Sequence, residues 1–425
     1  KLCIGFQRLS IIDLSAPSQP FINRQNNIVM ACNGEIYNYI SLKNQLVSKG
    51  YHFSTQTDTE VILHGYQEWG EKLWPKLNGI FAIIIWDERA EKLFLVRDKF
   101  GEKPLYYGWN NGVFLFGSDI SSIRQHKNFD NKINKKSLDY YFKLSYIPAP
   151  LTIFSSVAKL IPGHYLTIDT LDGYKSTLKN YWNILNLVKE NKNTKIREDD
   201  SHYISMCENL LSESVISRSI SDVPIGTFLS SGVDSTLISL LLQKNSQNKI
   251  NTFTIGYDSI LNDETALAKS ISSHIGTNHH ELIINFQNIF ETINEIPETY
   301  SEPFADSSQI PTMIISKFAK QNVSVVLTGD AGDEVFGGYN RYIWLSYFLK
   351  LNPIKKKIFL LIIQLLKKHS YFVLSLEKIF KPFIKDNNFL LKIDKIHSLL
   401  KSNEFKEMYF SLIFHDNFND SVLKD

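Results

Sequence analysis

The chain has 425 residues, more than one hydrophobic core usually supports, so two domains are expected. Its hydrophobic content of 43%, charged content of 21% and net charge of +2 are typical of a soluble globular protein and do not indicate a nucleic-acid-binding or membrane-binding surface. Cys3, Cys32 and Cys207 match neither a disulfide framework nor a zinc site, which indicates a reducing compartment, and we expect the cytoplasm.

The N-terminal part of the chain has the pattern of short strands joined by tight turns. Residues 1–6 are predicted as a strand, and because no initiator methionine precedes them we expect the chain to be a fragment. The stretch 41–50 is predicted as a helix that ends at Gly50. Residues 81–98 and 105–119 each hold two apolar runs around a polar turn, which predicts two β-hairpins. This part is therefore expected to be α+β, with antiparallel strands.

The sequence becomes polar and charged over residues 184–202, where we predict a linker between a first domain, 1–183, and a second domain, 203–425. Predicted helices and strands alternate in the second domain, with strands at 225–229, 251–257 and 323–330 and helices at 203–220, 235–244, 264–275 and 309–321. This alternation predicts an α/β domain with a parallel sheet, whose ligands bind beyond the carboxyl ends of the strands. A later apolar run, 358–366, is too short to span a membrane, which takes about 20 residues.

The stretch FLSSGVDSTL, residues 228–237, joins a predicted strand to a predicted helix. A glycine-containing loop of this kind points backbone N–H groups inward, and the helix start adds its positive dipole end, so the loop suits phosphate. Asp234 would repel phosphate unless a cation intervened, which suggests Mg²⁺. The alternative is a capped turn with Asp234 or Ser235 as N-cap, and this loop alone does not decide between the two.

A second stretch, VVLTGDAGDEVFGGYNRY (325–342), gathers Asp330, Asp333 and Glu334 after a predicted strand. Three close carboxylates repel one another unless a metal or protons offset the charge, although a solvated acidic turn is an alternative. The first loop lacks the Gly-Lys-Ser/Thr ending of a Walker A motif and resembles the ATP pyrophosphatase loop, with Ser231 in place of the usual glycine. Together the two loops resemble the synthetase domain of glutamine-hydrolysing asparagine synthetases.

That resemblance implies an ATP site with Mg²⁺. The residues implied to hold the pyrophosphate are Ser230, Ser231, Gly232, Asp234 and Ser235. The residues implied to line the adenosine site are Leu229, Ile255, Thr328 and Gly329. Asp234 and Asp333 are the implied Mg²⁺ ligands. Asp330 stands where the family has a glutamate proposed to deprotonate ammonia, and it is one methylene shorter.

The first domain resembles the glutaminase domain of the same family, an N-terminal-nucleophile amidotransferase with a four-layer sandwich. The resembling stretches are QRLSIIDLS (7–15), NGEIYNY (33–39), TDTE (57–60) and RDKFGEKPLYY (97–107). They hold groups suited to glutamine, because a planar cation binds a carboxylate, anions bind an ammonium group, and amide N–H groups form an oxyanion hole. The respective candidates are Arg8 for the α-carboxylate, Glu35 and Asp58 for the α-ammonium, and Asn33 and Gly34 for the oxyanion hole.

Each of these motifs also has a plain alternative. Asn33 and Gly34 alone would be a common turn, and Arg8 and Asp58 alone would be surface charges, but the order and spacing of all the motifs favour the glutaminase. A further group in this domain, Arg97, Asp98 and Lys103, is expected to stabilise the domain junction.

The chain departs from the family at both ends. The family's nucleophile is a cysteine at the mature N-terminus, whose α-amine serves as its base. Cys3 lies only five residues before Arg8, much closer than the family's spacing, and Cys32 directly precedes Asn33 and is expected in the core. The family's C-terminal lysine segment has no match before Asp425. Both catalytic extremities are therefore expected to lie outside this sequence.

The resemblance implies that glutamine is hydrolysed in the first domain and that ammonia travels inside the protein to the second. There ATP would activate the β-carboxylate of aspartate as an adenylate, and ammonia would convert it to asparagine with release of AMP. The expected partners are small molecules, and a homodimer is considered as the assembly.

Two alternatives remain open. A β-lactam-synthetase-like or polysaccharide-cluster amidotransferase would act on another carboxylate, and a degenerate homologue would act as a binding or scaffold protein. The intact glutamine set argues for retained use of glutamine, and Asp234 and Asp333 argue against a non-catalytic role.

Overall fold

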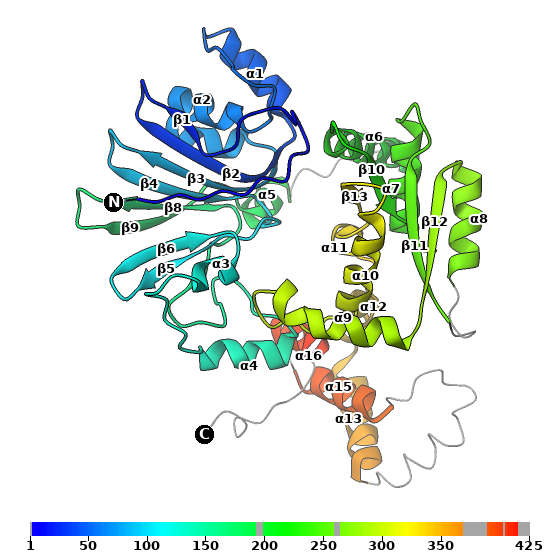
Figure 1. The fold of residues 1–425 in the computed structure, drawn as a ribbon. Coiled ribbons are helices and arrows are strands. Elements are labelled where there is room, and N and C mark those ends of the chain that lie inside the picture. Colours follow the sequence, from blue (N-terminus) through cyan, green and yellow to red (C-terminus); the bar gives the residue numbers. More distant parts are fainter. Residues whose placement is uncertain (1, 193–198, 259–263, 369–388, 403, 415–425) are drawn as a thin grey trace. The chain divides into compact units, whose positions relative to one another are not determined.

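The computed structural model describes residues 2–192, 199–258, 264–368, 389–402 and 404–414 (Figure 1). It divides into two compact units. The first unit comprises Lys1–Leu138 and Ile147–Gly329, and the second comprises Asp139–Tyr146 and Asp330–Asp425. The division passes through the second domain predicted from the sequence, directly after Gly329.

A six-stranded antiparallel sheet forms the centre of the N-terminal half (Figure 1). Its strands, in spatial order, are β1 (Phe21–Asn23), β2 (Ile28–Ile36), β3 (Gly79–Asp87), β4 (Lys92–Arg97), β8 (His164–Asp169) and β9 (Lys175–Asn180). Alternation along β3 sends Phe81, Ile83 and Ile85 to one face, where all three are fully buried. The opposite face carries Ala82 and Ile84.

Both faces of this sheet are covered. On one face lie α1 (Tyr39–Val47), α2 (Glu60–Trp69) and the 3-10 helix η1 (Gly70–Lys76), with Leu46 and Trp74 in a shared core. The other face packs on a three-stranded sheet made of β5 (Tyr106–Asn110), β6 (Val113–Gly117) and β7 (Ala158–Lys159). The short helix α3 (Ile120–Arg124) packs against β6. This layering confirms the predicted α+β glutaminase-type sandwich, including both hairpins.

The predicted strand at residues 1–6 is wrong. Leu2–Phe6 have no regular secondary structure, and Leu2 and Cys3 are exposed. The edge of β2 at Cys32 already has a partner, because the side chain of Gln19 binds both the N–H and the carbonyl of Cys32. The Cys32 N–H donates to Gln19 Oε1 at 2.7 Å, and Gln19 Nε2 donates to the Cys32 carbonyl at 3.2 Å.

The predicted linker, 184–202, is partly helical. It contains α5 (Ile184–Asn191), whose N-cap Asn183 accepts from the Leu185 N–H at 2.8 Å, and the start of α6 (Asp200–Arg218). All α5 side chains are exposed, and residues 193–198 of the predicted linker lie outside the described ranges.

The predicted parallel sheet is confirmed in the next part of the chain. Four parallel strands lie in the order β12 (Asn278–Ile284), β11 (Asn251–Tyr257), β10 (Ile225–Phe228) and β13 (Val325–Leu327). The accompanying helices are α7 (Val233–Lys244), α8 (Thr265–Ile275), α9 (Phe286–Thr299) and α10 (Gln309–Ala319). The edge strand β12 and helix α9 were not predicted, because β12 opens with four polar residues and α9 contains Pro297.

The described part of the second unit is largely helical. It contains α11 (Gly332–Phe336), α12 (Asn340–Leu349), α13 (Pro353–Lys368), α15 (Phe389–Lys401) and α16 (Phe405–Ile413). The end of α4 (Lys135–Leu144) also belongs to it. The apolar run 358–366 lies in α13 and contributes Ile363 to the core of this unit. Over the described ranges, no helix reaches both the length and the apolarity that crossing a membrane requires.

Candidate functional site

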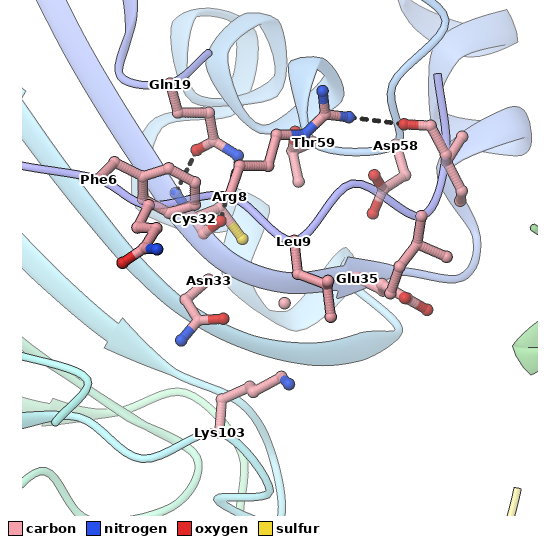
Figure 2. Close-up of a pocket in the computed structure, with 14 residues that line it drawn as sticks. Phe6, Arg8, Leu9, Gln19, Cys32, Asn33, Glu35, Asp58, Thr59 and Lys103 are labelled. Atoms are coloured by element: carbon pink, nitrogen blue, oxygen red, sulfur yellow. Dashed lines mark hydrogen bonds between the residues drawn. The ribbon is translucent and has the colours of Figure 1, made fainter. Parts of the chain in front are cut away.

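All five predicted glutamine-binding residues, Arg8, Asn33, Gly34, Glu35 and Asp58, line one cavity of about 110 Å³ (Figure 2). They come from three places in the sequence: the irregular segment before β1, strand β2, and the turn that leads into α2. The fold of the N-terminal half therefore brings the three motifs together, although their roles toward glutamine stay predictions.

Gly34 and Asn33 give the cavity its wall on β2. Gly34 has a φ of +148°, and a Cβ atom there would lie 2.0 Å from the carbonyl oxygen of Ile80 on β3. Only glycine therefore fits at this position. The side-chain amide of Asn33 donates to Ser118 Oγ at 3.0 Å, which fixes its orientation. The Asn33 side-chain amide is thus fixed in orientation and the Gly34 backbone is closely packed, and an oxyanion hole needs such fixed groups.

Two carboxyl groups, one buried and one half-buried, provide the negative side of the cavity. Asp58 accepts a hydrogen bond from the Ile36 N–H at 2.7 Å, and burial, only partly offset by such N–H donors and by Arg8, raises its pKa to about 6. Burial and the charge of Asp58 also raise the pKa of Glu35, while Lys103 lowers it. A pair of desolvated carboxylates attracts a cation, because an ammonium group would relieve their mutual repulsion.

Arg8 is turned toward its own segment. Its Nη2 donates to the carbonyl oxygens of Ile12 at 2.6 Å and Asp13 at 3.1 Å, and its Nη1 donates to that of Ala16 at 3.3 Å. The guanidinium therefore shapes the segment that covers the cavity, and its field also lowers the pKa of Asp58.

The junction role of Arg97, Asp98 and Lys103 stays a prediction, and the hydrogen bonds of Arg97 and Asp98 are local. Arg97 donates to the carbonyl oxygens of Lys103 at 2.8 Å, Leu160 at 2.6 Å and Gly101 at 2.7 Å, all in the N-terminal half. Asp98, which is 1% exposed, accepts from four backbone N–H groups, including those of Glu102 and Lys103, both at 2.9 Å. The pair thus fixes the loop that follows β4, and this loop brings Lys103 to the cavity.

The predicted ATP-binding loop lies between β10 and α7 and is held by its own polar groups. Ser235 Oγ accepts from the Ser230 N–H at 3.1 Å and lies 2.8 Å from Ser230 Oγ, and the Gly232 N–H donates to Ser230 Oγ at 3.0 Å. Just below the loop, the buried hydroxyl groups of Thr227 on β10 and Ser239 on α7 form a hydrogen bond at 2.7 Å. Strand, loop and helix start therefore form one fixed unit with hydroxyls at its tip.

The remaining predicted ATP residues surround that loop at the carboxyl ends of neighbouring strands. Leu229 is 2% exposed, and its N–H donates to the Phe253 carbonyl on β11 at 2.9 Å. Ile255 lies two residues further along β11, and Thr328 and Gly329 directly follow β13. A Cβ atom at Gly329 would lie 2.8 Å from the Ser235 nitrogen. The close approach of the two loops fits a ligand held by backbone and hydroxyl donors.

Comparison with known proteins decides the family. A glutamine amidotransferase domain model matches residues 1–182, and an asparagine synthase model matches residues 206–375. Asparagine synthetase 1 of Bacillus subtilis, named glutamine-hydrolysing, is 36% identical over 341 residues, covering 80% of this chain and 52% of that protein. A Methanocaldococcus jannaschii relative, named provisionally as glutamine-hydrolysing asparagine synthetase 2, is 35% identical over 358 residues, covering 80% of this chain and 67% of that protein. The chain belongs to the glutamine-hydrolysing asparagine synthetase family.

The chain spans about half the length of several curated members of this family that it matches. The metal prediction involves Asp234, which lies in the first unit, and Asp333, which lies in the second. Asp333 lies on α11 beside Gly338, where a Cβ atom would lie 2.0 Å from Asp333 Oδ1. Within the described ranges, no cluster of three or more His, Cys, Asp or Glu side chains is arranged for a metal ion. The Mg²⁺ role of Asp234 and Asp333, and the ammonia role of Asp330, stay predictions.

Nine of the cavity-lining residues were not in the predicted glutamine-binding set, and they include Gln19, Cys32 and Lys103. Cys32 is 1% exposed and burial raises the pKa of its thiol, so it belongs to the core, as expected. Gln19 carries no local sequence signal, because its bonds to Cys32 depend on the folded sheet. Lys103 lies within the motif RDKFGEKPLYY (97–107). Its position at the cavity depends on how the strands pair and could not be predicted from the motif.

Proposed function

We propose that the protein carrying this chain amidates aspartate to asparagine, using ATP and ammonia from glutamine, and releases AMP, pyrophosphate and glutamate. The observation that carries the proposal is that one cavity collects every residue predicted to bind glutamine, in a chain that also retains the ATP loop of its family.

In the glutaminase half, the α-ammonium of glutamine would lie against Glu35 and Asp58, whose repulsion it would relieve. The γ-carbonyl would face Asn33 and Gly34, so that the oxyanion of the tetrahedral intermediate meets a fixed amide and close backbone N–H groups. Arg8 holds the covering segment over the cavity, and its charge favours the α-carboxylate.

In the synthetase half, the hydroxyls of Ser230 and Ser235 and the start of α7 would receive the phosphates of ATP. Leu229 and Ile255 offer apolar surface to the adenosine. Mg²⁺, held by Asp234 and Asp333, would offset the phosphate charge when bound. Closing this site to water would protect an acyl adenylate from hydrolysis, so that ammonia is its acceptor.

The deciding experiment measures AMP formation by the full-length protein with ATP, Mg²⁺ and ammonia across a panel of carboxylic acids. We expect AMP and asparagine in equal amounts with aspartate alone, and we expect glutamine to replace ammonia. Turnover with a different acid would transfer the assignment to an amidotransferase of another carboxylate. ATP binding without AMP from any acid would identify a non-catalytic homologue.

A further inference from the structure

Lys103 contributes a positive charge to the glutamine cavity that the predicted set of binding residues does not include. The cavity has two cationic lining residues, Arg8 and Lys103. In Figure 2 Arg8 and Lys103 lie on opposite sides of Asn33, and the guanidinium group of Arg8 points away from Asn33. The three hydrogen bonds of Arg8 go to carbonyl oxygens of its own segment. The ammonium group of Lys103, by contrast, has no hydrogen-bond or ion-pair partner in the part of the chain that the structure describes.

The backbone of Lys103 is held firmly from both sides. Its N–H donates to Asp98 Oδ2 at 2.9 Å, and its carbonyl accepts from Arg97 Nε at 2.8 Å. At Gly101, in the same loop, φ is +70° and a Cβ atom would lie 2.7 Å from Pro162 and 2.9 Å from Arg97 Cζ. Such a loop does not swing freely, so the side chain starts from a fixed point beside the cavity.

The strand register explains why this fixed point lies beside the proposed oxyanion position. Gly34 on β2 pairs with Phe81 on β3, and the Asp98 N–H donates to the Phe81 carbonyl at 2.9 Å. The loop that starts at Asp98 therefore leaves the sheet two strands away from Gly34, at the same level along the strands. Lys103 is half-buried and lines the cavity, and its charge lowers the pKa of Glu35 on the cavity wall.

A half-buried ammonium group in a cavity is stabilised by an anion. Glutamine hydrolysis places negative charge at two positions, the α-carboxylate throughout and the γ-oxygen during and after the reaction. Arg8 lies on the opposite side of Asn33 from Lys103. Lys103 is thus on the side where the γ-group would lie if Asn33 and Gly34 form the oxyanion hole.

We propose that the Lys103 ammonium group forms the γ-end of the glutamine site, where it attracts the charge that develops on the γ-carbonyl oxygen and that stays on the γ-carboxylate of glutamate. This inference rests on the proposed use of glutamine, and it adds a charged contact at the reacting end of the substrate.

The test compares L-glutamate with L-glutamine, which differ only in the γ-group. Titrations would measure the dissociation constant of each ligand with the full-length protein and with its Lys103→Met and Lys103→Arg variants. We expect Lys103→Met to weaken glutamate binding about tenfold or more and glutamine binding less than about threefold, because only glutamate loses a charge-assisted contact. Lys103→Arg should restore glutamate binding to within about threefold, because it keeps the charge.

Three other outcomes would overturn the inference. Equal weakening of both ligands, restored by arginine, would place Lys103 at the α-carboxylate. Equal weakening that arginine does not restore would make it a structural residue of the loop. Unchanged binding of both ligands would remove it from the site. Lys72→Met, which alters an exposed lysine of η1, serves as the matched control and should match the unaltered chain throughout.

The titrations also separate this inference from the proposed function. If the unaltered chain binds glutamine and Lys103→Met loses nothing selectively, the Lys103 inference alone fails. If the unaltered chain binds neither ligand, the glutamine part of the proposed function fails and the inference falls with it.

Discussion

Asp58 and Glu35 are two neighbouring carboxyl groups that a cationic ligand group would stabilise. Asp58 is buried and Glu35 is half-buried, and burial raises the pKa of both, while the charge of Asp58 raises the pKa of Glu35 further. The pKa of Asp58 lies at about 6, above its ordinary value of 3.8. Its contribution to folding is therefore fully present at low pH and is lost as the pH rises through about 6. The ionised form of Asp58 lowers the stability of the ligand-free protein, and it is also the form that would bind an ammonium group.

The first prediction concerns pH. Glutamine affinity should fall as the pH drops through about 6, because Asp58 then gains a proton and no longer attracts the α-ammonium. Titrations of glutamine between about pH 5 and about pH 8 would measure this dependence. Asp58→Asn should weaken binding about tenfold at the upper pH and flatten the profile. A profile as steep in Asp58→Asn as in the unaltered chain would assign the titration to another group.

A second prediction at the residue scale concerns Gly34. Gly34→Ala places a Cβ atom 2.0 Å from the Ile80 carbonyl oxygen at a φ of +148°. We expect the free energy of unfolding to fall by about 2 to 4 kcal/mol through strain and overpacking. Denaturant unfolding followed by tryptophan fluorescence would measure it. Gly5→Ala is the matched control, because nothing lies within 4 Å of its Cβ position. Equal stability of the two variants would contradict the packing argument.

At the scale of elements, the turn before α2 is held by a single buried carboxylate. Glu60 accepts from the N–H groups of Ser54 at 2.9 Å and Thr55 at 2.8 Å, and from Thr55 Oγ1 at 2.7 Å. Burial raises the pKa of Glu60, but the His64 ring and the Ser54 and Thr55 donors outweigh it and lower the pKa to about 2. This contribution to stability is therefore present above the ordinary value of 4.5 and is lost as the pH falls through about 2. The start of α2 thus fixes the loop that carries Asp58.

The third prediction follows from that anchor. Glu60→Gln keeps the size but removes the charge, so we expect a loss of about 1 to 3 kcal/mol in the free energy of unfolding. Weaker glutamine binding should accompany it, since Asp58 lies in the same turn. Denaturant unfolding and glutamine titration would measure both effects. Glu88→Gln, at an exposed turn between β3 and β4, is the control. Unaltered stability in Glu60→Gln would show that the turn is held by other contacts.

The elements also show how much the sequence could predict. Both hairpins and the parallel strands follow from local patterns, because alternation and apolar runs record which side chains each strand buries. The prediction of a strand at residues 1–6 was wrong. An apolar stretch forms a strand only where a neighbouring strand offers a free edge, and at Cys32 the edge of β2 is bound by the side chain of Gln19. The set Arg8, Asn33, Gly34, Glu35 and Asp58 was predictable from its motifs. The place of Lys103 was not, because it depends on the pairing of β2, β3 and β4.

At the scale of the whole molecule, two kinds of sheet build two kinds of site on one chain. The antiparallel sandwich places its cavity beside β2, under an irregular segment. The parallel sheet places its loop at the carboxyl end of β10, where α7 begins. Each site draws on its own hydrogen bonds, so a substitution in one should not alter the chemistry of the other. Pairing between strands that are far apart in the sequence creates both sites, so neither geometry can be predicted from a single sequence motif.

The fourth prediction tests this separation in the full-length protein. Asp58→Asn should lower glutamine-dependent AMP formation about tenfold or more and change ammonia-dependent AMP formation less than about twofold. Asp234→Asn should lower both rates about tenfold or more, because both need ATP. Parallel rate measurements with glutamine and with ammonium chloride would show the pattern. Loss of the ammonia-dependent rate in Asp58→Asn would mean that the two sites do not act separately.

Gln19 has a consequence for the behaviour of the protein in a crowded solution. Its side chain pairs with both main-chain groups of Cys32, as a neighbouring strand would. An open strand edge recruits strands from other molecules and so begins aggregates. A single side-chain amide occupies this edge at Cys32 without adding a strand. With Gln19 in place, the main-chain N–H and carbonyl of Cys32 are therefore not available to a strand of another molecule.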